Sequence, residues 1–191
     1  MVKILQKTVF IGSAIVCVLY FLYALAFSTP WALGTRYGDF FTQAQEVNHL
    51  IFQWGLWTLL FSLLGLVFQS HNNRHLHLFN YVFLGLSVAF MAHTAYLTLV
   101  NVPPLKEVYL SLDTLSHRMV LGTNGLRALF PADAQITDIV ARIAVLFDLG
   151  AWLAKALYVS AGLMLAVGLL KTGITVATAF RRRKWEEENA R

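Results

Sequence analysis

Charged residues and cysteine are both scarce in this sequence of 191 residues. Only 13% of the residues are charged, about half the usual share of a soluble domain, and 58% are hydrophobic. Such a composition excludes an intrinsically disordered chain, and a single cysteine excludes a scaffold held by intrachain disulfides. A water-soluble globule with so few charges would expose too much apolar surface to stay dispersed. We therefore expect a membrane protein.

The few charges lie mostly outside a long apolar region. Between residues 8 and 105 the charged side chains are Arg36, Asp39, Glu46 and Arg74. Basic residues gather near the two ends instead, as Lys3 and Lys7 and as the cluster 181–184, RRRK. Both groups adjoin apolar segments, which is typical of juxtamembrane anchors. The sequence thus predicts a lipid bilayer, and no nucleic acid, as a partner.

Four apolar segments are long enough to cross a bilayer as helices, at about residues 9–27, 50–68, 79–100 and 143–175. A helix rises about 1.5 Å per residue, so about twenty residues cross a hydrocarbon layer of about 30 Å. We expect the first segment to be retained as a signal anchor, although residues 24–26 resemble a cleavage site. The predicted fold class is an all-α integral membrane protein, one domain over residues 1–191 built as a four-transmembrane-helix bundle.

The ends of these helices follow from local signals. The short polar connection 69–78 predicts an antiparallel hairpin of the second and third helices. The second helix is expected to start early, with Asp39 as its cap, and Pro103–Pro104 is expected to end the third.

The fourth apolar region is longer than one span requires. A span at residues 143–170 would put Lys171 at the inner interface, whereas a span at 157–180 would leave 136–155 as an amphipathic helix on the outer surface. Because no proline follows Pro131, we expect one long tilted helix that combines both placements.

The segment 101–142 separates the third and fourth helices. Within it, apolar residues at positions 105, 108, 112, 115 and 119 recur at helical spacing. This pattern predicts an amphipathic helix on the outer side of the bundle. Two interpretations remain open: a helix lying on the lipid surface or across the bundle, and a docking surface for a partner.

The distribution of basic residues predicts the orientation. With the N-terminus in the cytoplasm, the inner side carries eight basic residues and the outer side five, beside six acidic ones. Both termini are therefore expected in the cytoplasm, with residues 181–191 as a basic cytoplasmic tail, in a bacterial-type inner membrane or a plasma membrane.

Small and aromatic residues are expected to serve the bundle itself. Residues Gly55, Thr58, Ser62 and Gly65 form one stripe, which predicts close helix–helix packing. Four tryptophans near the predicted outer ends are interpreted as interface anchors: Trp31, Trp54, Trp57 and Trp152.

Two histidines are the candidates for a cofactor site. His93 lies about 10 Å deep in the third predicted span, behind the small residues Gly85 and Ala89. In a structural role, His93 would form a hydrogen bond to a neighbouring helix. In a functional role, it would be a ligand of haem b or would contact a quinone. His49 is the candidate second axial ligand, but it lies about 10 Å away in depth. No metal site is predicted.

Asp148 and Lys155 are the candidate interaction residues. They are seven residues apart, so they share one helix face about 10 Å from each other and cannot pair directly. Each therefore needs a partner on another helix or another subunit, unless both lie at the interface with Lys155 snorkelling.

Common catalytic motifs are absent, including Walker, GxSxG, HExxH and CxxC patterns. We therefore expect that the protein has no catalytic activity of its own. The preferred hypothesis is a non-catalytic subunit or scaffold that associates with other membrane subunits or with copies of itself. The alternatives are a haem- or quinone-binding redox anchor that uses His93 and a component of a transporter or channel.

Overall fold

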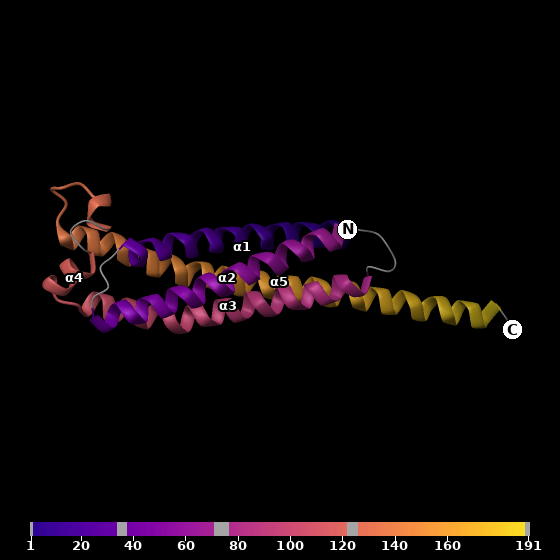
Figure 1. Cartoon of the computed structure of the whole chain (residues 1–191). Coiled ribbons are helices and arrows are strands. Elements are labelled where there is room, and N and C mark those ends of the chain that lie inside the picture. Colours follow the sequence, from indigo (N-terminus) through magenta and orange to yellow (C-terminus); the bar gives the residue numbers. More distant parts are fainter. Residues whose placement is uncertain (1, 34–37, 71–76, 122–125, 190–191) are drawn as a thin grey trace.

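Four long helices make up most of the molecule. The computed structural model describes residues 2–33, 38–70, 77–121 and 126–189 (Figure 1). The long helices are α1 (Val2–Leu33), α2 (Gly38–Ser70), α3 (His77–Ser111) and α5 (Ile136–Asn189). A short helix α4 (Thr114–Leu121) and a 3-10 turn (Leu126–Leu129) complete the described elements. The prediction of an all-α chain is confirmed, and each long helix is long and apolar enough to cross a membrane.

The long helices form an antiparallel bundle in which each packs against two others. The contacts follow the cyclic order α1, α2, α3, α5 and back to α1. Helix α4 lies at one end of the bundle, hereafter the α4 end, and both chain termini lie toward the other, hereafter the terminal end (Figure 1). An even number of long helices thus returns the chain to the side on which it began.

Helix α2 starts early, as predicted. Its first residue, Gly38, has a φ of +69°, a left-handed conformation that glycine adopts without steric strain. Asp39 follows in the first turn, where a carboxylate interacts favourably with the helix dipole. The turn chemistry of these two residues therefore sets the beginning of the helix.

Helix α3 continues through the two prolines, so the prediction that Pro103–Pro104 ends it was wrong. The prolines remove two backbone N–H donors, yet the helix extends to Ser111. Val102 just before the prolines and Leu105 and Tyr109 after them recur at helical spacing, and all three are buried in the core. Their burial compensates for the lost hydrogen bonds and keeps the segment helical.

The predicted amphipathic helix 105–121 is also corrected, because the structure divides it in two. Helix α3 ends at Ser111, and Asp113 starts α4 by accepting a hydrogen bond from the Ser116 N–H at 2.9 Å. The buried face of α4 is formed by His117, Val120 and Leu121. Of the five apolar positions that suggested a single face, only Leu105 is buried.

Helix α5 is one continuous helix of 54 residues, as predicted. From Ile139 to Gly168 a buried residue recurs every three or four positions, which is the signature of packing on one side. The side chain of Lys171 is half-buried, and every described side chain beyond it is exposed. Residues 172–189, hereafter the α5 overhang, project past the terminal end of the bundle (Figure 1).

An aromatic cluster fills the bundle core toward the α4 end. Trp31 is only 4% exposed, and its ring contacts those of Phe27, Phe40, Tyr109 and Phe147. The interpretation of Trp31 as an interface anchor was therefore wrong, since packing against four rings outweighs an interfacial position. Trp57 and Trp152 are exposed, and Trp54 is half-buried.

Candidate functional site

Hydroxyl groups pair α2 with α3 inside the bundle. The hydroxyls of Thr58 and Thr94 lie 2.7 Å apart, and the Ser87 hydroxyl donates to the Phe61 carbonyl at 2.8 Å. The four residues of the predicted α2 stripe are all buried, so its packing role is confirmed. These bonds fix the register of the two helices and provide a scale for comparing depth along them.

His93 lies on the outside of the bundle. Its side chain is exposed, and its ring meets the edge of Trp54 with the ring centroids 4.4 Å apart. The expected hydrogen bond to a neighbouring helix is not among the bonds of the described residues. Contact with an aromatic ring holds this imidazole in place instead.

The structure does not bring His49 and His93 together. Because Thr58 pairs with Thr94, His93 is nearly level with Thr58, nine residues from His49. That separation is about 13 Å along α2. His49 is exposed as well, and no group of three or more metal-binding side chains occurs within the described ranges. The arrangement offers no paired axial ligands.

Asp148 has a partner that the sequence did not reveal. Lys106, on the part of α3 beyond the prolines, donates to the Asp148 carboxylate at 2.6 Å. The two side chains are 28% and 65% exposed, so the pair is solvated and contributes little to stability. This ion pair depends on α3 continuing past Pro104, which the sequence argued against.

Lys155 lies two turns further along the same side of α5 and is exposed. Trp152 and Val159, one turn on either side, are 72% and 62% exposed. We call the four residues Asp148, Trp152, Lys155 and Val159 the α5 outer face. Among the residues that the structure places, none forms a hydrogen bond or ion pair with Lys155.

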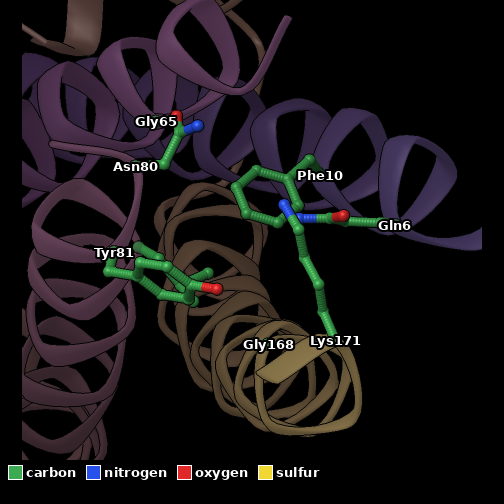
Figure 2. Close-up of a pocket in the computed structure, with 8 residues that line it drawn as sticks. Gln6, Phe10, Gly65, Asn80, Tyr81, Gly168 and Lys171 are labelled. Carbon is green, nitrogen blue, oxygen red and sulfur yellow. The ribbon is translucent and has the colours of Figure 1, made fainter. Parts of the chain in front are cut away.

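A small cavity lies at the terminal end of the bundle (Figure 2). All four long helices line it: Gln6 and Phe10 of α1, Gly65 of α2, Asn80, Tyr81 and Leu84 of α3, and Gly168 and Lys171 of α5. The space that a water-sized group can occupy in it is about 20 Å³, enough for one such group. The hollow including its open mouth measures about 300 Å³.

The polar side chains of this cavity lack partners within the described chain. Gln6 is 7% exposed and its amide forms no hydrogen bond there, and the buried Asn80 Oδ1 likewise has none. The Lys171 side chain reaches from α5 toward Gln6 and Phe10 of α1 (Figure 2). None of the eight lining residues is acidic. The site therefore offers one positive charge and two amides.

Sequence reasoning missed this cavity. One of its two placements of the fourth span put Lys171 at the inner interface, but it gave no role to Gln6 or Asn80. The available signal was that each of these residues lies at the terminal end of a separate apolar helix. Their convergence depends on the rotation of three helices about their axes, which hydropathy alone does not specify.

Comparison with known proteins leaves the site without a precedent: no family model, no curated protein and no solved structure matches this chain.

Proposed function

We propose that the four long helices cross a membrane with both termini in the cytoplasm. The ion-paired Asp148 and the half-buried Lys171 lie about 35 Å apart along α5. That distance slightly exceeds the thickness of a hydrocarbon layer, about 30 Å. The terminal end carries the basic cluster 181–184, which favours the cytoplasmic side of a bacterial-type inner membrane or a plasma membrane.

Lys155 is the observation that carries the functional proposal. In this placement it lies seven residues, about 10 Å, inside the outer boundary of the hydrocarbon. A lysine at mid-bilayer costs at least about 2.5–3.5 kcal/mol on insertion scales, and snorkelling recovers part of that cost. Lys155 is exposed next to an exposed tryptophan and has no acidic neighbour within bonding distance in the described ranges.

The chain then acts as a non-catalytic subunit of a larger membrane assembly. The α5 outer face is its contact surface, and Lys155 pairs with an acidic or polar group of the partner. A second copy related by a two-fold axis along the membrane normal would bring two Lys155 side chains toward each other, and their positive charges would repel. A different membrane subunit with an acidic group in its span is therefore the favoured partner.

Replacement of Lys155 by leucine tests this proposal. We expect at least one co-purifying membrane protein to fall about tenfold in Lys155→Leu while the variant still inserts, because a charged interaction is lost. Quantitative mass spectrometry of preparations in mild detergent measures the recovery.

Arg142→Leu is the matched control, because it removes an exposed positive charge of α5 outside the proposed span. Its partners should be recovered as with the wild type. Unchanged recovery of every partner in Lys155→Leu would remove the α5 outer face as the contact surface.

A further inference from the structure

We propose that the cavity at the terminal end binds a phosphate group. The ligand is an anion held by the Lys171 ammonium and the amides of Gln6 and Asn80. Two sources can supply this chemistry, the headgroup of a phospholipid in the cytoplasmic leaflet and a free phosphate. The inference rests on the membrane placement proposed above, but not on association with a partner.

The charge of the lining residues selects an anion. Lys171 is the only ionised side chain among the eight, and no carboxylate neutralises it within the lining. Lysine binds phosphate as a point charge, and amide N–H groups add directional hydrogen bonds. A cation would meet repulsion from Lys171 and find no acidic ligand in this cavity.

A buried amide oxygen without a partner indicates that the site is incomplete as it stands. A buried polar group without a hydrogen bond costs about 1–3 kcal/mol, so folded proteins rarely leave one unpaired. Here the buried Asn80 Oδ1 atom has no partner in the described chain. The Gln6 side chain, which is 7% exposed, lines the same cavity and forms no hydrogen bond with the described residues. With the oxygen and nitrogen of the Asn80 amide exchanged, its N–H group and that of Gln6 would donate to a ligand oxygen in the cavity.

The shape of the cavity agrees with a headgroup rather than a fully enclosed ion. The space open to a water-sized group is about 20 Å³, and the hollow with its open mouth measures about 300 Å³, so a phosphate group would be only partly enclosed there. The site also lies where the proposed bilayer places the phosphates of its cytoplasmic leaflet, just beyond the hydrocarbon. A lipid phosphate therefore reaches this mouth without leaving its own leaflet.

The test is a titration of the full-length protein in mild detergent. Binding is measured by the change in tryptophan fluorescence and by the shift in the midpoint of thermal unfolding. The probes are dioctanoyl phosphatidylglycerol, dioctanoylglycerol, which has the same chains but no phosphate, and inorganic phosphate. We expect saturable binding of phosphatidylglycerol and none of dioctanoylglycerol. Competition by inorganic phosphate at similar concentration would assign the site to a free anion, and its failure to compete would assign it to the lipid.

Three variants connect the binding to the cavity. Lys171→Gln is expected to weaken binding at least about tenfold, because it removes a charge-assisted hydrogen bond. Gln6→Leu, which keeps the charge, is expected to weaken binding about fivefold. Lys7→Gln is the matched control, because Lys7 is the exposed neighbour of Gln6, and its affinity should stay within twofold of the wild type.

Two results would overturn the proposal. One is binding of dioctanoylglycerol as tight as that of phosphatidylglycerol, which would show recognition of chains only. The other is an equal loss of affinity in Lys7→Gln and Lys171→Gln, which would show attraction to the basic surface in general. Neither result depends on Lys155, so failure here is distinguishable from failure of the subunit proposal.

Discussion

At the scale of single residues, two glycines of α5 that look alike in sequence have opposite roles. Gly150 is buried against Tyr23, so a Cβ at this position would overlap with the tyrosine hydroxyl. At Gly162, by contrast, the space that an added Cβ would occupy is open. Gly150 permits the close approach of α1 and α5. Gly162 has no such packing role and only lowers the stability of the helix, as glycine does in a helix interior.

Alanine substitutions at these positions are expected to act in opposite directions. Gly150→Ala should lower the free energy of unfolding by about 1–3 kcal/mol, because the core has no room for the added methyl group. Gly162→Ala should leave it unchanged or raise it by up to about 1 kcal/mol through helix propensity. Unfolding in mixed micelles measures both, and equal effects would contradict the packing of α1 on α5.

His93 is expected to be structural. Its exposed imidazole contacts Trp54 and lies about 13 Å along the bundle from His49, so no second axial ligand faces it. The purified protein should show no Soret band, and His93→Leu should leave the visible spectrum unchanged. A Soret band that disappears in His93→Leu would instead support the redox-anchor alternative.

At the scale of elements, the start of α4 depends on one carboxylate. Hydrogen bonds from the Ser116 hydroxyl and the Ser116 backbone N–H lower the pKa of Asp113 in the folded protein. Because the pKa of Asp113 is lowered in the folded protein, the stability that its carboxylate contributes is complete above the unfolded-state pKa. That stability is lost as the pH falls through the folded-state pKa. The cap is therefore strongest at neutral pH and weakens in acid.

Asp113→Ala is expected to increase hydrogen exchange at the Ser116 amide several-fold at neutral pH, because the N-cap acceptor is removed. Asp113→Asn is the control, since asparagine caps helices but does not titrate. The ratio of the wild-type to the Asp113→Asn exchange rate at each pH measures the titration. This ratio should rise as the pH falls, and a constant ratio would show that the carboxylate charge has no part in the cap.

The element boundaries show where prediction from sequence succeeds and fails. The long apolar runs, the early start of α2 and the continuity of α5 were predictable, because they depend on local hydropathy, glycine and the absence of proline. The course of α3 past Pro104 was not, because it depends on Val102, Leu105 and Tyr109 finding a core made by other helices. The Asp148–Lys106 pair was missed for the same reason, since it requires that extension.

The candidate site, too, was predictable from the sequence only in part. Individual residues such as Lys155 and Lys171 were recognisable as charges in or beside an apolar helix. The cavity was not, because hydropathy reports how apolar a helix is and not which side of it faces its neighbours. The four long helices have little amphipathicity, so they lack the signal that orients a helix in a soluble bundle.

At the scale of the whole molecule, the bundle predicts which loops lie on which side of the membrane. The tests are single-cysteine variants Asn72→Cys, in the α2–α3 connection outside the described residues, and Ala132→Cys, on the α4 side. In intact cells an impermeant thiol reagent should label position 132 and not position 72, because the positive charges retain the terminal end inside.

The native Cys17 is buried and should not react, so the unsubstituted chain serves as the blank. Membranes opened by mild detergent should allow labelling at both positions, which shows that each thiol is reactive. Labelling of position 72 from outside, or protection of position 132 in intact cells, would refute the orientation with both termini in the cytoplasm.

The unbroken length of α5 gives the molecule a mechanical property. A helix of 54 residues is a rod of about 80 Å, and the part from Ile139 to Gly168 packs against the rest of the bundle. The α5 overhang extends about 27 Å past the bundle, so a tilt of about 10° at its base displaces the far end by about 5 Å. In the membrane placement proposed above, a partner that tilts α5 by contact with its outer face would move the basic residues of the same helix on the opposite side of the membrane.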